Sequence, residues 1–152
     1  MNRNEKLASS ALHLLHRAGQ IADELFTLNI GTSDLTPRQY EVLRAISMTD
    51  EPSQTQLVEM TGIDRSTLAD IVRRLVDRGL VSRKRTRHDA RMYALKLSDK
   101  GMAAIRDAEP AVSQTDERLL GALPARERDA FIKGLERMIE ELSVPSEPAK
   151  PV

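Results

Sequence analysis

The stretch from Asp64 to Arg91 constrains the fold more than any other part of the chain. Asp64 is typical of a helix N-cap, because its carboxylate can accept hydrogen bonds from the free N–H groups of the next turn. Apolar side chains then recur at helical spacing and predict a helix with one buried face: Leu68, Ile71, Val72, Leu75 and Val76. Gly79 is expected to end this helix, since glycine adopts the left-handed conformation without a steric penalty.

Two short segments with strand-like composition follow this helix. They cover residues 80–85 and 92–97, and they flank an arginine-rich polar loop at residues 86–91. Three residues of the second segment alternate with their neighbours, as in a strand with one buried face: Tyr93, Leu95 and Leu97. A helix followed by a hairpin with a basic tip predicts a winged unit that reads DNA.

The distribution of charge supports this interpretation. The whole chain has a formal net charge of zero, but residues 64–91 contain nine basic and four acidic side chains. Arginine outnumbers lysine eight to one among these basic residues, and its guanidinium group binds phosphates and base edges through two parallel hydrogen bonds. An ordinary solvated helix face is the alternative, but a basic face on an otherwise acidic body favours a DNA-binding protein.

Composition and motifs disfavour several other classes of protein. A chain of 152 residues is long enough for one domain with a core, and the absence of cysteine excludes disulfides, thiolate metal sites and thiol-based redox sensing. No apolar run approaches the roughly 20 residues that span a membrane, and residues 1–10 lack the layout of a secretory signal, so we expect a cytoplasmic protein without membrane contact. Without a glycine-rich phosphate loop, nucleophile elbow or histidine-bearing catalytic motif, we expect neither an enzyme nor a cofactor.

The segments before Asp64 predict three further helices. The first covers residues 5–29 and has a wide apolar stripe. The second covers about residues 36–49 and opens with a threonine cap and a proline in the first turn. The third is a short helix over residues 53–60, joined by a glycine-containing turn to the helix that Asp64 opens. Two short helices joined in this way form a helix-turn-helix.

Two long helices are predicted after the wing. The first runs from Ser98 to about Leu120, and Pro110 is expected to kink or split it. The second covers residues 125–142 and precedes a proline-rich tail. The predicted fold class is mainly α (α+β), and the chain divides as follows: residues 1–34 as an N-terminal dimerisation helix, 35–98 as a winged helix-turn-helix DNA-binding region, 99–143 as C-terminal dimerisation helices, and 144–152 as a disordered tail.

The terminal helices carry more apolar surface than one chain can cover, which favours a homodimer. A twofold dimer places two reading helices in successive major grooves, roughly 34 Å apart, and predicts a palindromic operator in double-stranded DNA. Such a dimer also explains how one short helix achieves specificity, because two copies read both halves of the site.

Several motifs go beyond a general helix-turn-helix pattern. They are Leu35-Thr36, Gln39-Tyr40, Val42-Leu43, Gln56-Leu57, Gly62-Ile63-Asp64, the run from Leu75 to Val81, Asp89-Ala90-Arg91, and Leu97-Ser98 with Gly101. On these motifs, residues 5–142 resemble the MarR family of winged-helix transcriptional regulators. Val58 and Ser98 differ from the residues commoner in the family, but neither carries chemistry.

The resemblance implies a homodimer that binds palindromic promoter DNA and usually represses transcription. It also implies a small-molecule site in each subunit, between the dimer helices and the DNA-reading region, whose occupation releases the DNA. The favoured effector is a small aromatic or phenolic carboxylate, and an acyl-CoA thioester is the bulkier option.

The candidate DNA-binding residues lie in the helix that follows Asp64 and in the wing. They are Arg65, Ser66, Thr67, Asp70, Arg73, Arg74, Arg85, Arg87, His88, Asp89 and Arg91. The family pattern implies that Arg91 enters the minor groove, where Asp89 would orient its guanidinium group. The alternatives are a surface ion pair between these two residues, worth about 0–1 kcal/mol, and an Asp70 that is merely exposed.

The candidate effector-binding residues combine imidazole, phenol and guanidinium groups on the first two predicted helices: His13, His16, Arg17, Arg38, Tyr40 and Arg44. Such groups around an apolar gap would suit a ligand with a ring and an anionic end. The alternative is that the exposed arginines are ordinary and that Tyr40 belongs to the core. A metal site at His13 and His16 is disfavoured, because structural zinc needs four ligands and only His88 remains.

Two other functions stay open. One is a constitutive DNA-binding or architectural protein that has the fold but no working effector site, and ligand-dependent loss of DNA affinity would exclude it. The other is a protein-interaction module on a degenerate winged helix. The basic face argues against this module, and a steep fall of DNA affinity with salt would argue against it further.

Overall fold

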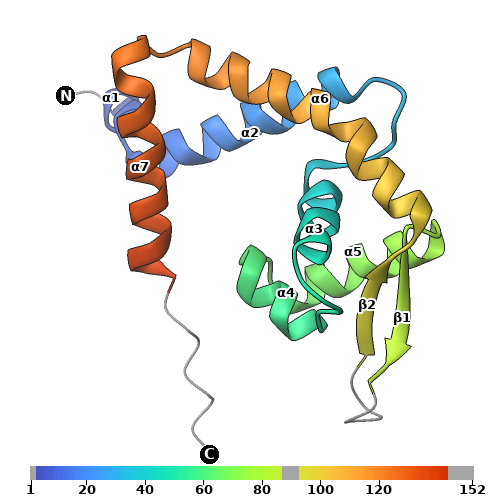
Figure 1. The fold of residues 1–152 in the computed structure, drawn as a ribbon. Coiled ribbons are helices and arrows are strands. Elements are labelled where there is room, and N and C mark those ends of the chain that lie inside the picture. The colour runs from blue at the N-terminus through green and yellow to red at the C-terminus, as the bar shows by residue number, and fades with distance from the viewer. Residues whose placement is uncertain (1–2, 87–92, 144–152) are drawn as a thin grey trace, which may run out of the picture.

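The computed structural model describes residues 3–86 and 93–143. The elements in these residues are α1 (Arg3–Ala8), α2 (Ala11–Ile30), α3 (Pro37–Ser47), α4 (Gln54–Thr61), α5 (Arg65–Asp77), β1 (Val81–Arg85), β2 (Tyr93–Leu97), α6 (Asp99–Gly121) and α7 (Ala125–Leu142). Helices α3 to α5 and the two strands form one unit, here called the reading head, and the other helices extend from it (Figure 1).

The core of the reading head lies where its three helices, β2 and the first half of α6 meet. Its most deeply buried side chains come from all of these elements: Val42, Leu43, Leu57, Leu68, Val72, Leu75, Leu95 and Ile105. The apolar face predicted for α5 is confirmed, with only Val76 among its members partly buried. Because α5 packs through this face on α3 and α4, its polar face stays exposed.

Strands β1 and β2 form an antiparallel hairpin in which Arg83 pairs with Leu95. The segment before α4 joins this hairpin, because the Leu95 N–H donates to the Pro52 carbonyl at 2.9 Å and Ser53 forms a bridge with Ala94. The start of α4 is therefore fixed beside β2, close to the exposed face of α5.

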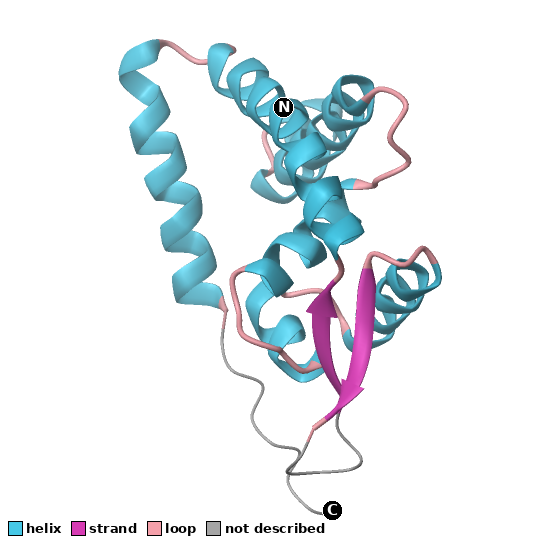
Figure 2. Cartoon of the chain, turned by 45° about the vertical axis from the view of Figure 1, so that its right-hand side comes forward, coloured by secondary structure: helices cyan, strands magenta, loops and turns pink. Residues whose placement is uncertain are grey.

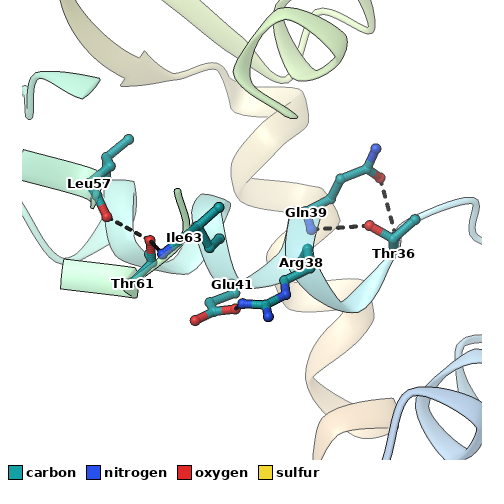
Figure 3. A network of polar contacts seen from close by, with 7 residues as sticks. All are labelled: Thr36, Arg38, Gln39, Glu41, Leu57, Thr61 and Ile63. Atoms are coloured by element: carbon teal, nitrogen blue, oxygen red, sulfur yellow. Dashed lines mark hydrogen bonds and ion pairs between the residues drawn. The ribbon is translucent and has the colours of Figure 1, made fainter. Parts of the chain in front are cut away.

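Side-chain caps confirm the predicted helix starts. Thr36 Oγ1 accepts from the Gln39 N–H at 3.1 Å, and Gln39 Oε1 accepts from the Thr36 N–H at 3.2 Å, which is a capping box (Figure 3). Ser53 and Gln56 form the same arrangement at the start of α4. Gly79, just after α5, has a φ of +73°, so a side chain at this position would be strained, as the sequence predicted.

Helices α2 and α6 pack against each other beyond the reading head, and α7 turns back as a separate column beside it (Figures 1 and 2). A hydrogen bond of 3.1 Å from Asn29 Nδ2 to Thr115 Oγ1 joins α2 to α6. α7 has no buried residue in this single chain. No helix in the described ranges combines the length and apolar character needed to cross a membrane.

One helix prediction is wrong, and another is wrong in part. The helix predicted over residues 5–29 is divided into α1 and α2, because Ser10 Oγ caps α2 by accepting from the His13 N–H at 3.5 Å. Serine side chains compete with helical backbone hydrogen bonds in this way. Pro110 does not split α6, which continues from Asp99 to Gly121. Pro110 lies on the exposed side of α6, and burial of the opposite side holds the turns before and after it in place.

The prediction that Tyr93 is buried is also wrong, since 43% of this side chain is exposed. Buried positions on β2 are instead Ala94 and Leu95, which face opposite sides. Leu95 joins the core, and Ala94 is buried outside that cluster, so both faces are buried in the middle of the strand. The predicted disorder of residues 144–152 lies outside the described residues.

Candidate nucleic-acid interface

The exposed face of α5 borders a groove with a volume of about 610 Å³. Its walls come from the start of α4, from α5 and from the hairpin, and these residues line it: Ser53, Gln54, Thr55, Arg65, Ala69, Asp70, Arg73, Arg83 and Tyr93. α5 and the hairpin belong to the same unit (Figure 1). α5 and β1 pack against each other, and both contribute residues to this groove. In winged helix-turn-helix proteins the second helix of the motif enters the major groove of DNA.

Arginines from two elements make this groove basic. Arg65 and Arg73 come from α5, and Arg83 comes from β1. A further arginine, Arg85, has its guanidinium carbon 6.0 Å from the centroid of the Tyr93 ring, which is within cation–π distance. Guanidinium donors around a concave surface suit the phosphate oxygens of a nucleic-acid backbone.

Asp64 organises the first turn of α5. Its carboxylate accepts from the Thr67 N–H at 3.2 Å and from the Ser66 hydroxyl at 2.8 Å. These hydrogen bonds lower the pKa of Asp64 from 3.8 to about 2, and the contribution of Thr67 is the largest, followed by that of Ser66. Asp64 is therefore ionised at neutral pH and holds the exposed start of the reading helix in place.

Asp70 binds two arginines from the next turn of α5. One of its carboxylate oxygens accepts from Arg73 Nη2, and the other accepts from Arg74 Nε at 3.0 Å. The hydrogen bond from Arg73 is the largest cause that lowers the pKa of Asp70, and the charge of Arg74 adds to it. The three side chains remain accessible, with 43% of Asp70 and 64–65% of the two arginines exposed.

The structure brings three of the predicted DNA-binding residues into the groove, namely Arg65, Asp70 and Arg73. Four others lie on α5 or β1 without lining it: Ser66, Thr67, Arg74 and Arg85. The remaining four fall outside the described residues: Arg87, His88, Asp89 and Arg91.

Six lining residues were not predicted from the sequence: Ser53, Gln54, Thr55, Ala69, Arg83 and Tyr93. Arg83 could have been found, because alternate residues of a strand share a face and Arg85 was already a candidate. The residues at the start of α4 could not have been found from the sequence, because their position depends on the contact that fixes the start of α4 beside β2.

The candidate effector-binding residues form two separate groups. His13, His16 and Arg17 lie in the first half of α2. α3 meets α2 further along, where the rings of Phe26 and Tyr40 have centroids 6.1 Å apart. The helical rise puts Arg17 roughly 13 Å from Phe26 along the axis of α2. A single described chain therefore does not bring the group on α2 to the group on α3.

The α3 group also has local partners of its own. Arg38 Nη1 lies 3.3 Å from Glu41 Oε2, and its side chain points away from the Thr36 cap (Figure 3). Tyr40 is partly buried against the core, which favours the alternative that it is a packing residue. Arg44 is exposed, and none of the six candidates lines the groove at α5. Their effector role stays a prediction.

Arg78 connects the end of α5 to the start of α3. Its Nη1 donates to the Asp34 carbonyl and to Gln39 Oε1, each at 3.3 Å. The Arg78 carbonyl in turn accepts from Lys100 Nζ at 3.0 Å. These contacts join the end of the reading helix to the start of α3 and to the first turn of α6.

Large apolar side chains remain exposed on three of the terminal helices. On α1 and α2 they are Leu7, Leu12, Leu14, Leu15, Ile21 and Leu28. On α7 they are Phe131, Ile132, Met138, Ile139 and Leu142. Apolar faces of this extent mark interaction surfaces in soluble proteins.

Known transcriptional regulators are similar to this chain in sequence. The model of the MarR family matches residues 33–92. The transcriptional regulator HosA of Escherichia coli is 34% identical over 106 residues, which cover 70% of this chain and 78% of that protein. The HTH-type transcriptional repressor NicR of Pseudomonas putida is 32% identical over 128 residues, which cover 84% of this chain and 81% of that protein.

Solved structures match most of the chain. PcaV from Streptomyces coelicolor, in complex with its natural ligand, has a TM-score of 0.81 at 30% identity and covers 88% of this chain and 94% of that one. The repressor CouR, bound to a 23-mer DNA duplex, has a TM-score of 0.81 at 29% identity, and the match covers 91% of this chain and 98% of CouR. BpsR of Bordetella bronchiseptica has a TM-score of 0.81 at 28% identity, and the match covers 88% of this chain and 96% of BpsR. The chain therefore belongs to the MarR family and is a winged-helix transcriptional regulator rather than an enzyme.

Proposed function

We propose that this protein is a homodimeric repressor that binds palindromic promoter DNA through the α5 groove and is released by a small anionic effector. The observation that carries the proposal is the groove itself, in which Arg65, Arg73 and Arg83 surround the exposed face of the reading helix. Arginines from both the helix and the wing can contact the phosphates on either side of a major groove while α5 approaches the bases. The likeness to CouR, which was solved on a DNA duplex, supports this docking.

The homodimer is proposed from the exposed apolar faces of α1, α2 and α7. A second copy would remove these side chains from water, and burial of apolar surface contributes about 25 cal/mol per Å². A twofold axis between the copies would present two α5 helices to one face of the duplex, roughly 34 Å apart. This geometry matches a palindromic operator.

The effector is proposed to be an aromatic or phenolic carboxylate, or its acyl-CoA thioester. In BpsR, 6-hydroxynicotinic acid regulates DNA binding, and PcaV was solved with its natural ligand. For this chain, α2 carries an imidazole pair and a guanidinium group, with His13 partly buried and His16 and Arg17 exposed. In the dimer, the partner copy would cover this part of α2 and enclose the group. A carboxylate paired with Arg17 would then be shielded from water, and the low local dielectric would strengthen the ion pair.

Fluorescence anisotropy tests the proposal. The wild-type protein would be titrated onto a duplex that it selects from a random pool, and onto a shuffled duplex of the same composition. Aromatic acids and their CoA thioesters would then be added to the complex. We expect specific binding that one compound class reverses. Binding that no compound reverses would favour a constitutive DNA-binding protein, and the failure to select any sequence would refute the repressor.

A matched pair of variants tests the effector site. Arg17→Ala should preserve operator affinity and weaken release by the effector, because the anionic end loses its partner. Arg126→Ala removes the same charge from the exposed start of α7 and should behave like the wild-type protein. Equal sensitivity of both variants to the effector would place the site elsewhere.

A further inference from the structure

Asp70 is an unexpected residue at a DNA interface. Among the described residues that line the groove at α5, it is the one carboxylate, and it lies between Arg65 and Arg73 on the reading helix. DNA phosphates repel a carboxylate, so its presence weakens every contact that depends on charge alone. Pairs of this kind on an exposed helix contribute little to stability, which leaves the fold without a need for it.

Both oxygens of Asp70 are occupied in the free protein. Arg73 and Arg74 each donate to a different oxygen, so two of the exposed cations of α5 are held by one anion of the same helix. The three groups together carry a charge of +1 rather than the +2 of the arginines alone. A phosphate that approaches this part of α5 must compete with Asp70 for these guanidinium groups.

We propose that Asp70 is a specificity-determining residue that withholds Arg73 and Arg74 from DNA of the wrong sequence. The inference rests on the proposed function, since it assigns a role within the same DNA interface. Contacts to the DNA backbone offer Asp70 no donor, so when the two arginines turn to phosphates its carboxylate loses them without a replacement. A matching site can compensate it, because the amino groups of cytosine and adenine in the major groove donate to such an acceptor. A carboxylate has about four acceptor positions, so two remain after the arginines have bound.

The consequence is a penalty that falls mainly on nonspecific binding. Asp70→Asn keeps the size of the side chain and removes its charge, and it frees the two arginines for phosphates. Affinity for nonspecific DNA should then rise on the order of tenfold at low salt. The slope of log affinity against log salt should steepen by about 0.9 for each new phosphate contact. Affinity for the operator should stay level or fall, so the ratio of specific to nonspecific affinity should drop by at least about tenfold.

The test measures this ratio for four proteins by anisotropy across a range of salt concentrations. The probes are a duplex selected by the wild-type protein from a random pool and a shuffled duplex of equal length. Asp70→Asn is compared with the wild-type protein and with Asp70→Glu, which keeps the charge and should keep the ratio. Asp77→Asn is the matched control, because Asp77 is exposed on the same helix but does not line the groove and is in no ion pair among the described residues.

Tighter nonspecific binding and a steeper salt slope in Asp70→Asn alone would establish the role. If the wild-type protein prefers its duplex but Asp70→Asn and Asp77→Asn change the ratio equally, the effect is one of general charge and the inference is overturned. If Asp70→Asn loses affinity for both duplexes, Asp70 supports binding rather than selectivity, which also overturns it. A wild-type protein without any preference would refute the proposed function, and this inference with it.

Discussion

Replacing Gly101 by alanine should destabilise the protein, although alanine is the better helix former. An alanine Cβ at this position would lie 2.1 Å from the Leu80 carbonyl oxygen and 3.3 Å from Leu97 Cδ2. Ordinary contact begins at 3.4 Å, so the first turn of α6 and the residue before β1 must separate by about 1 Å. This is the point at which α6 is joined to the reading head, since the Ser98 N–H donates to the same carbonyl at 3.1 Å.

The magnitude follows from two opposing contributions. Alanine in place of glycine within a helix stabilises by about 1 kcal/mol. Overpacking against neighbours costs about 1–3 kcal/mol, and the upper end applies here because the atom met is backbone and cannot rotate away. We therefore expect Gly101→Ala to lower the free energy of unfolding by about 2 kcal/mol.

Urea denaturation followed by circular dichroism measures this change, at one fixed protein concentration because the stability of the proposed dimer would depend on concentration. Gly121→Ala is the control at the other end of α6, where an added Cβ meets nothing within 4 Å. That variant should be neutral or more stable by up to about 1 kcal/mol. A Gly101→Ala protein as stable as the wild type would refute the proposed close contact.

Three further predictions concern the N-cap of α5, the α2–α6 contact and the dimer. The pKa of Asp64 is depressed to about 2 from 3.8, so its stabilising effect is complete above pH 3.8 and is lost as the pH falls through about 2. Asp64→Ala should therefore be less stable than the wild type at neutral pH in urea melts, and the gap should close over that window. Thr115→Val should cost about 1 kcal/mol, because it leaves Asn29 Nδ2 without its acceptor, and a loss near zero in thermal melts would contradict this. Ile139→Glu should yield monomers in analytical ultracentrifugation, because Ile139 is 66% exposed on α7, and an intact dimer would exclude this face.

Local chemistry explains which parts of the fold could be predicted. The starts of α3, α4 and α5 depend on side chains within four residues of the cap, so the sequence contains all the information needed. The apolar face of α5 was predicted for a similar reason, since helical spacing alone determines it. The break before α2 was missed because Ser10 competes with a helix that the apolar stripe also supports.

Tertiary contacts explain what could not be predicted. Tyr93 has the spacing of a buried strand residue, but it is exposed while its neighbour Ala94 is buried. The segment before α4 that pairs with this part of β2 is remote in sequence, so the local pattern does not contain this contact. The groove needs three separate parts of the chain, so only three of its α5 residues were predicted: Arg65, Asp70 and Arg73. The candidate effector residues on α2 and α3 are separated within one described chain, so only the proposed dimer could bring them together.

The dependence of operator affinity on salt tests the central claim most directly. Arg83 is the groove arginine that comes from the wing, so it distinguishes this surface from the reading helix alone. For Arg83→Gln, we predict weaker operator binding and a salt slope that is shallower by about 0.9 per protomer, as expected for the loss of one phosphate contact. Arg126→Gln on α7 should leave both quantities unchanged. An Arg83→Gln protein with the affinity and slope of the wild type would show that DNA does not enter this groove.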